Sequence, residues 1–280
     1  MVWGSVHRAQ RVGDEVTPYY DEGGITIYHG DCREIIPQVG PVKMVFTDPP
    51  YGHNNNNGDL IHRRELALGL VPCTNEVQPG ARPIANDGPE ANDLVRWMFA
   101  ATAKLLSPGD CCCCCCCGGG PDPQFARWSL WMDEVYDFKQ MVVWDKGPLG
   151  MGWHYRRSYE TILVGQVPGA ACCWYDETNR IENIIRHIPK VIPTASDHPT
   201  QKPPKLAGHF IQLHSRPGNI VLDPFMGSGT TLVAAKNLGR RAIGIEIEEQ
   251  YCELAVKQLA QTMPMLPLEE VRGNSTGASA

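Results

Sequence analysis

The sequence predicts an α/β fold with a parallel sheet. A strand over residues 24–30, a helix over 32–39 and a strand over 42–47 follow one another at the spacing of a βαβ unit. Residues 219–246 repeat that order, with a glycine turn after the first strand. In parallel sheets ligands gather at the carboxyl ends of the strands, so we expect a binding site where these strands end.

Length and composition are typical of a soluble globular protein. The chain has 280 residues, of which 42% are hydrophobic and 20% charged. We expect an N-terminal extension over residues 1–23, one folded domain over 24–262 and a disordered tail rich in Pro, Gly and Ser over 263–280. The net charge is −6, so a surface that binds nucleic acid has to be locally basic.

Twelve cysteines include a run over residues 111–117 and the pair Cys172-Cys173. Neighbouring residues on a strand point to opposite faces, so the run cannot form an ordinary disulfide framework. No CxxC pair with zinc-ligand spacing stands out, and neither a signal sequence nor a long apolar span is evident, so we expect a reducing cytosol and no metal site. The run is interpreted as a buried central strand, with a metal or redox site as the alternative.

The remaining elements follow from periodicity and from Pro and Gly breaks. Helices are expected over residues 92–106, 123–135, 204–215, 232–238 and 248–261, and strands over 141–145, 160–166, 219–222 and 241–245.

The stretch Thr47-Asp48-Pro49-Pro50-Tyr51-Gly52 follows a buried strand and is the first candidate site. Two consecutive prolines fix φ and remove two backbone donors. The free carbonyls and the Asp48 carboxylate can accept hydrogen bonds from an amino group, and the Tyr51 ring can stack on a flat ring. This composition predicts a clamp for a planar group that carries an exocyclic amine.

The second candidate site is the glycine turn that starts at Asp223. Gly227 and Gly229 allow close backbone approach to a ligand, and the helix that follows offers free N–H groups. Glu246, at the end of the next strand, occupies the place of an acid that binds ribose hydroxyls. The turn is not GxGxxG and no Lys follows Gly229, so the pattern favours a nucleoside-bearing cofactor over a nucleoside triphosphate.

Three segments without regular periodicity are candidates for substrate contact. Residues 53–92 form a long loop that leaves from Tyr51 and is either substrate-facing or a solvated insertion. Residues 147–158 combine Gly, aromatic and basic residues, which suits phosphates and bases, although a solvated hairpin tip is the alternative. Residues 168–197 add further basic side chains. The predicted DNA-binding residues are His154, Arg156, Arg157, Arg186 and Lys190.

The motifs Asp48-Pro49-Pro50-Tyr51, residues 198–203 (HPTQKP) and residues 223–231 (DPFMGSGTT) resemble the three signatures of DNA amino-methyltransferases. They occur in the order of the permuted β class, over about residues 24–259, and phage- and prophage-borne members look most similar. The resemblance implies a Rossmann-like, seven-stranded, mostly parallel sheet with an antiparallel edge hairpin from the strands at 141–145 and 160–166. It also implies S-adenosylmethionine as the cofactor.

The resemblance assigns roles to individual residues. Asp223, Phe225, Gly227 and Gly229 would line the methionine part of S-adenosylmethionine, Glu246 its ribose and Asp31 its adenine, with Lys202 near its carboxylate. His198, Thr200, Ser228 and Thr230, from the same motifs, complete the predicted cofactor-binding set. Asp48, Pro49, Pro50 and Tyr51 would be the catalytic residues.

The implied reaction is methyl transfer to a base flipped out of double-stranded DNA. Aspartate at the first motif position favours N6 of adenine over N4 of cytosine. Methylation of RNA or of a protein amide is a weaker alternative, because those families place the cofactor loop before the catalytic motif. A non-catalytic DNA-binding protein is another. The resemblance leaves homodimerisation and a partner nuclease open.

Overall fold

The computed structural model describes residues 16–52, 84–116, 124–147, 158–190 and 201–262. The described chain forms one mixed sheet in the order β1-β2-β9-β8-β3-β4-β6-β5-β7. The pairs β2-β9, β9-β8, β8-β3, β3-β4 and β5-β7 are parallel, whereas β1-β2, β4-β6 and β6-β5 are antiparallel. The predicted mostly parallel α/β sheet is therefore confirmed.

The strands have the following bounds: β1 Tyr20–Glu22, β2 Ile25–His29, β3 Met44–Thr47, β4 Cys111–Cys116, β5 Asp137–Asp145, β6 Tyr159–Gln166, β7 Ile184–Ile185, β8 Ile220–Asp223 and β9 Arg241–Glu246. The helices are α1 Cys32–Ile35, the 3₁₀ helix η1 Ile36–Gln38, α3 Ala91–Ala103, α4 Gln124–Asp133, α5 Pro204–His214, α6 Thr230–Asn237 and α7 Glu249–Gln261.

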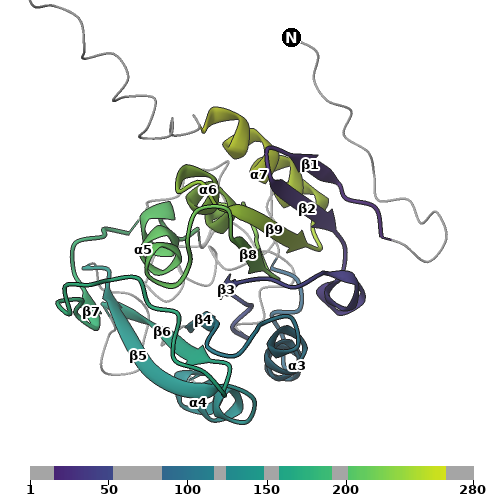
Figure 1. Ribbon diagram of the computed structural model, residues 1–280. Helices are drawn as coiled ribbons and strands as arrows, with labels where there is room; N and C mark the ends of the chain where they lie inside the picture. The colour runs from purple at the N-terminus through teal and green to yellow at the C-terminus, as the bar shows by residue number, and fades with distance from the viewer. Residues whose placement is uncertain (1–15, 53–83, 117–123, 148–157, 191–200, 263–280) are drawn as a thin grey trace, which may run out of the picture.

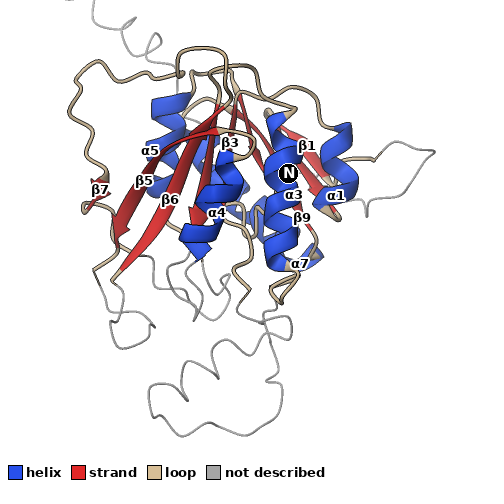
Figure 2. Ribbon diagram, turned by 90° about the horizontal axis from the view of Figure 1, so that it is seen from below, coloured by secondary structure: helices blue, strands red, loops and turns tan. Residues whose placement is uncertain are grey.

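Helices cover both faces of the sheet, which gives three layers (Figure 1). On one face α5, α6 and α7 bury Leu206, Phe210 and Leu232 against the sheet. On the other face α1, α3 and α4 form a second apolar cluster that includes Met98 and Trp128. Figure 2 shows the strands running side by side between the helices. Burial on both faces explains the continuous apolar runs of the central strands, since most of their described side chains are removed from solvent.

The predicted antiparallel hairpin is present as β5 and β6, but the short strand β7 lies outside it at the edge of the sheet. The described sheet has nine strands rather than seven. The additions are short: β7 pairs along β5 at one edge, and β1 pairs along β2 at the other. Strand β1 lies within the extension predicted over residues 1–23, and Tyr19 beside it is only 4% exposed. The folded unit therefore begins earlier than expected.

The cysteine run forms the central strand β4, as predicted. It pairs with β3 on one side and with β6 on the other. Successive thiols alternate between the two faces: Cys113 belongs to one apolar cluster, and Cys112 and Cys114 to the other. A thiol can be buried without an ionic partner, because it behaves as a small hydrophobe.

The strand ends form two further edges of the sheet, which are distinct from the outer strands β1 and β7. Because β2, β3, β4, β8 and β9 run parallel to one another, their carboxyl ends share one edge, which we call the catalytic edge. Strand β5 ends at the same edge, since it is antiparallel to β6 and β6 is antiparallel to β4. The opposite edge holds the start of β4 and the end of β6, where Cys111 pairs with Gln166.

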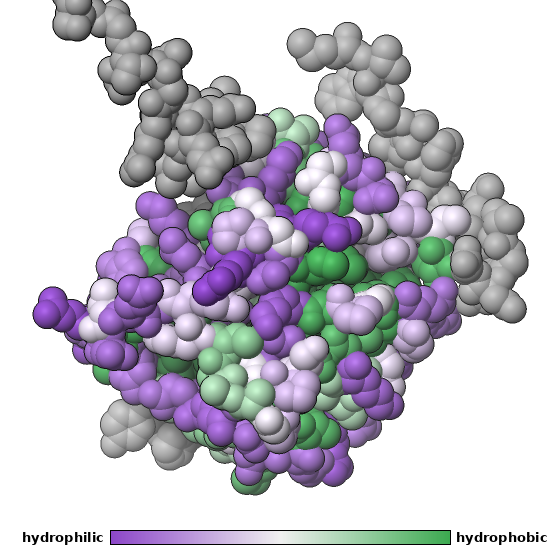
Figure 3. All heavy atoms as spheres, viewed as in Figure 1, coloured by the Kyte–Doolittle hydropathy of each residue, from purple (hydrophilic) through white to green (hydrophobic). Residues whose placement is uncertain are grey.

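The surface seen in Figure 3 is mostly hydrophilic, with apolar residues visible between polar ones. The large exposed apolar side chains of the described residues are Leu130, Met141, Trp174, Ile181, Ile184 and Ile247. Among the described helices, none has the length and apolar character needed to span a membrane. The predicted tail at 263–280 and most of the loop predicted over 53–92 lie outside the described residues.

Candidate active site

The stretch after β3 is held in place from both sides. The backbone N–H of Gly52, a residue with φ of 75°, donates to Asp87 Oδ1 at 2.8 Å. The Gln124 side-chain amide, from the start of α4, donates to the Tyr51 carbonyl at 2.7 Å. The two prolines have no N–H to satisfy. The chain therefore leaves the strand in a fixed direction, with Asp48 and Tyr51 at the catalytic edge.

The Asp48 carboxylate is the centre of a charged network. The Lys202 ammonium donates to Asp48 Oδ2 at 2.6 Å, and the Tyr51 hydroxyl donates to Asp48 Oδ1. Lys202 Nζ is also 3.1 Å from the Tyr51 hydroxyl and 5.3 Å from the centre of the Tyr51 ring. A carboxylate offers about four lone-pair sites. Asp48 can therefore accept a further hydrogen bond from a substrate amine.

Two more charged side chains extend this network. Lys202 Nζ is 3.2 Å from Glu160 Oε2, and Lys146 Nζ is 2.8 Å from Glu160 Oε1. Burial opposes the ionised form of Glu160, but Lys202 and Lys146 together lower the pKa of Glu160 to about 2. Burial raises the pKa of the Asp48 carboxyl above 3.8, and the Lys202 charge counteracts that rise. Two carboxylates and two ammonium groups thus balance within one buried network.

Asp223 links the two candidate sites. Its carboxylate accepts hydrogen bonds from the Thr47 hydroxyl at 2.8 Å, from the Thr231 hydroxyl at 2.6 Å and from the Phe225 N–H at 3.1 Å. Burial raises the pKa of Asp223 to about 6, although these hydrogen bonds oppose the rise. Because Thr47 directly precedes Asp48, this carboxylate fixes the glycine turn relative to the clamp.

The glycine turn between β8 and α6 needs its glycines for conformation and for space. Gly227 and Gly229 have φ of 50° and 82°, values that side chains disfavour. A Cβ at Gly229 would lie 2.6 Å from the Ala255 Cβ of α7. The N–H of Gly227 donates to Glu246 Oε2 at 2.9 Å, and the N–H of Glu248 donates to Glu246 Oε1 at 2.8 Å. Burial raises the pKa of Glu246 to about 7.

The clamp and the glycine turn line the same cavity. Its walls include Asp48, Pro49, Pro50, Tyr51, Lys202, Asp223, Phe225, Met226, Gly227, Ser228, Thr230 and Glu246. Carboxylates of Asp223 and Glu246 stand on the turn side, and Asp48 stands on the clamp side. The cavity can therefore hold two ligand groups next to each other, one at each set of residues.

The side chains on the turn side of the cavity fit a nucleoside cofactor that carries hydroxyl and ammonium groups. Asp223 and Glu246 are acceptors whose raised pKa values reflect burial, and ligand hydroxyls or an ammonium would stabilise their ionised forms. Phe225, Met226 and Ile247 add apolar surface for a flat ring. The residues present therefore fit the cofactor expected from the sequence.

The comparison with protein-family models decides the family. The model of N6/N4 DNA methylases, described as "DNA methylase", matches residues 42–257. The chain belongs to this DNA methylase family. Relatives agree: the DNA adenine methyltransferase YhdJ of Escherichia coli (strain K12) is 43% identical, over 95% of this chain and 94% of that protein. The type II methyltransferase M2.DpnII of Streptococcus pneumoniae is 26% identical, over 86% and 92% of the two chains.

A solved structure supports the fold and the cofactor of this DNA methylase. The crystal structure of the M1.HpyAVI–SAM complex superposes with a TM-score of 0.59 at 29% identity, covering 84% of this chain and 98% of that one. The DNA methylase is therefore an S-adenosylmethionine-dependent methyltransferase, as the sequence motifs indicate.

Two predicted cofactor residues of the DNA methylase have partners that differ from expectation. Asp31 is not among the described residues that line the cavity. Its carboxylate caps α1 by accepting from the Arg33 N–H at 2.8 Å, and it forms an ion pair with the Arg33 guanidinium at 2.5 Å. Lys202, expected near the cofactor carboxylate, lines the cavity but directs its ammonium to Asp48 and Glu160. Lys202 thus lies on the clamp side.

The predicted DNA-binding residues are only partly described. His154, Arg156 and Arg157, and likewise the cofactor-motif residues His198 and Thr200, lie outside the described residues. Arg186 and Lys190 are exposed and follow β7. Since β7 runs parallel to β5, Arg186 follows it at the catalytic edge, where it pairs with Glu182 at 3.1 Å. Residues 168–183, by contrast, start at the opposite edge after β6.

Sequence reasoning missed several residues of the site. Glu160 contacts Lys202 directly, and Lys146 contacts Glu160. Asp87 and Gln124 hold the clamp through hydrogen bonds to its backbone. Glu160 had one signal, a charged residue at the start of a strand that is otherwise apolar. The others are ordinary polar residues next to loops, and no local pattern distinguishes them.

Proposed function

We propose that this DNA methylase transfers a methyl group to N6 of adenine in double-stranded DNA. The observation that carries the proposal is the single cavity lined by both the Asp48-Pro49-Pro50-Tyr51 clamp and the glycine turn. Aspartate at the first clamp position and the similarity to an adenine methyltransferase at 43% identity support adenine over cytosine.

Asp48 and Pro49 are the proposed acceptors for the two hydrogens of the target amine. An amine inside a duplex is out of reach, so the base has to be flipped into the cavity. Acceptors on both hydrogens hold the amine nitrogen in one orientation, with its lone pair directed away from the clamp. Such positioning contributes several kcal/mol to lowering a barrier, up to roughly 7–11 kcal/mol in the best intramolecular cases.

Lys202 is the proposed positioning residue for Asp48. Its ammonium, 2.6 Å from Asp48 Oδ2, keeps the carboxylate ionised despite burial. Glu160 and Lys146 hold Lys202 from behind. Tyr51 is the proposed stacking surface, and its hydroxyl orients the other Asp48 oxygen.

Asp223, Glu246 and the backbone of the turn at Gly227 and Ser228 are the proposed cofactor-binding groups. When bound, S-adenosylmethionine supplies an electrophilic methyl group. Glu246 is placed to accept from hydroxyls, and Asp223 lies next to the clamp through its hydrogen bond with Thr47. Phe225 and Ile247 provide apolar contact.

The proposed target-recognition surface lies at the catalytic edge. Residues 147–158 leave the end of β5 at that edge, and Arg186 and Lys190 follow β7 there. Residues 168–183 are less suited to it, because they follow β6 at the opposite edge. Homodimerisation and a partner nuclease stay predictions of the sequence.

The decisive experiment is methylation-aware sequencing of DNA from cells that express the protein, alongside cells that express Asp48→Ala. We expect N6-methyladenine in one sequence context, present with the wild type and absent with the variant. Detection of methyl groups on N4 of cytosine in place of N6-methyladenine would show that the target base is cytosine. Near-normal methylation with Asp48→Ala would contradict the assigned catalytic site.

A further inference from the structure

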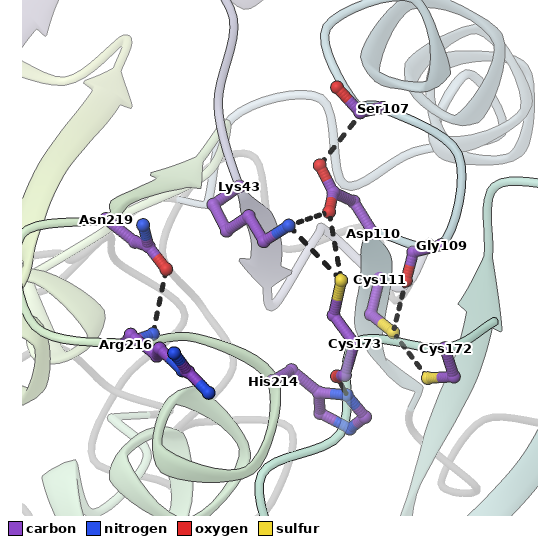
Figure 4. Close-up of polar contacts among 10 residues, drawn as sticks. All are labelled: Lys43, Ser107, Gly109, Asp110, Cys111, Cys172, Cys173, His214, Arg216 and Asn219. Atoms are coloured by element: carbon purple, nitrogen blue, oxygen red, sulfur yellow. Dashed lines mark hydrogen bonds and ion pairs between the residues drawn. The ribbon is translucent and has the colours of Figure 1, made fainter. Parts of the chain in front are cut away.

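A cluster of three potential metal ligands lies at the edge of the sheet opposite Asp48. Cys111 is the first residue of β4, Cys172 belongs to the loop after β6, and His214 is the last residue of α5 (Figure 4). The three come from parts of the chain that are far apart in sequence. This cluster has no contact with the cavity described above.

The distances between the three ligand atoms are close to those found around a bound zinc ion. Sγ of Cys111 and Sγ of Cys172 are 3.3 Å apart, and all three ligand atoms lie within 4.8 Å of one another. Tetrahedral zinc has Zn–S distances near 2.3 Å and Zn–N distances near 2.0–2.1 Å, which puts its ligand atoms about 3.5–3.8 Å apart. Small side-chain rotations are enough to reach that arrangement.

The two thiols differ in their access to solvent. Cys111 is buried, whereas Cys172 is exposed, so an ion can enter from the side of Cys172. Both are free cysteines, and a cysteine binds a metal as its thiolate.

His214 is oriented for coordination through its far nitrogen. The ring is buried, and Nδ1 lies 3.2 Å from the carbonyl oxygen of Cys173. A carbonyl only accepts, so this contact is a donation from Nδ1–H, and the lone pair of the neutral ring is on Nε2. A ligating histidine typically donates its other N–H to a carbonyl or carboxylate, which fixes the tautomer.

The remaining cysteines nearby are distinguished by their partners. Cys173 Sγ contacts Lys43 Nζ at 3.2 Å and Asp110 Oδ1 at 3.4 Å, so it faces a charged pair rather than the cluster (Figure 4). Cys112 and Cys114 point into the apolar cluster on the other face of the sheet. Of the described cysteines in the run, only Cys111 reaches the cluster.

We propose that Cys111, Cys172 and His214 bind a thiophilic divalent cation, Zn²⁺, at a site with three protein ligands. Two thiolates and an imidazole are ligands that zinc prefers, and the exposed side of Cys172 leaves a fourth position for water. The ion would join the loop after β6 to β4 and α5. It would add to the backbone hydrogen bonds by which the N–H groups of Cys173 and Tyr175 donate to the carbonyls of Gly109 and Leu213.

The test compares two adjacent cysteines. Reduced wild-type protein, Cys172→Ser and Cys173→Ser are freed of metal and titrated with Zn²⁺ against a chromophoric chelator. We expect one equivalent bound by the wild type. Loss of a ligand is expected to weaken binding by more than roughly 100-fold, since losing an outer-shell partner alone costs about 10–100-fold. Cys173→Ser is expected to stay within about 10-fold of the wild type.

Two further measurements keep the test independent of how the variants fold. X-ray absorption at the zinc edge of the loaded wild type should show two sulfur neighbours, with nitrogen or oxygen completing the shell; a shell of four sulfurs would overturn the assignment. His214→Gln should lose affinity as Cys172→Ser does. Absence of tight binding by the reduced wild type, or equal affinity of the two serine variants, would also overturn it. None of these readouts depends on methyl transfer.

Discussion

Replacing Lys202 by methionine isolates the electrostatic part of the proposed site. Methionine keeps an unbranched side chain of similar length and removes the charge. In the wild type the ammonium lies 2.6 Å from Asp48 Oδ2, where the lysine side chain is 10% exposed and the aspartate 24%. Without it, burial and the Glu160 charge favour the protonated form of Asp48 and only the hydrogen bond from Tyr51 opposes them, so the pKa of Asp48 should rise further above 3.8.

The size of the effect follows from the geometry of the contact. A hydrogen bond that involves a charged group contributes about 1.5–3 kcal/mol. Because the Asp48 carboxylate keeps some contact with solvent, we expect the lower half of that range, about 1.5–2 kcal/mol, for the contact between Lys202 and Asp48.

The assay is the pH dependence of single-turnover methyl transfer, with cofactor and duplex DNA saturating, over about pH 5–9. The ionised carboxylate is the proposed acceptor, so activity is lost as the pH falls through the pKa of Asp48. We expect this acid limb to move to higher pH in Lys202→Met, because removal of the ammonium disfavours the ionised carboxylate. Lys202→Arg, which keeps the charge, should restore most of the wild-type profile.

Lys205→Met is the matched control, since Lys205 is an exposed lysine in the first turn of α5, three residues after Lys202 in the chain. Its profile should coincide with that of the wild type. An acid limb that stays in place in Lys202→Met, or that moves equally in Lys205→Met, would refute the reasoning that Lys202 keeps Asp48 ionised.

Three other predictions address the rest of the cavity. Asp48→Ala should abolish methyl transfer but leave cofactor affinity largely intact in calorimetry; parallel loss of both would contradict separate clamp and turn sites. Thr47→Val should lower the free energy of unfolding in urea by about 1.5–3 kcal/mol, because Asp223 loses a buried hydrogen bond to a charged group, whereas Thr26→Val, at an exposed pair, should cost less. The pKa of Glu246 is raised from 4.5 to about 7 on folding, so the folded apoprotein binds the extra proton and its stability should fall as the pH rises through that window. Glu246→Gln should flatten this dependence in denaturation curves, and an unchanged slope would exclude Glu246 as its source.

The sequence alone predicted the fold class and most elements correctly. The βαβ units over residues 24–47 and 219–246 are local: their periodicity, turns and strand ends all lie within a few residues of one another. The buried strand β4 was likewise readable, because a run of small apolar side chains suits a strand covered on both faces. What the sequence missed were the short edge strands β1 and β7, which have too few residues to show a period.

The candidate site divides in the same way. The clamp at Asp48 and the turn at Asp223 were predicted because each is a contiguous motif whose residue types carry its chemistry. Their meeting in one cavity depends on β3 and β8 being neighbours in the sheet and on the Thr47–Asp223 hydrogen bond, and only the tertiary structure shows both. The position of Lys202 differed from expectation, since its motif gives no direction for its ammonium.

Only the tertiary structure brings together the charges around Glu160 and the ligands around Cys111. Lys146, Glu160 and Lys202 meet because the end of β5, the start of β6 and the segment before α5 lie close together at the catalytic edge. Cys111 and Cys172 meet because β6 runs antiparallel to β4 and returns the chain to the opposite edge. Periodicity states which face of an element is buried, but strand order and register decide which distant side chains share that space.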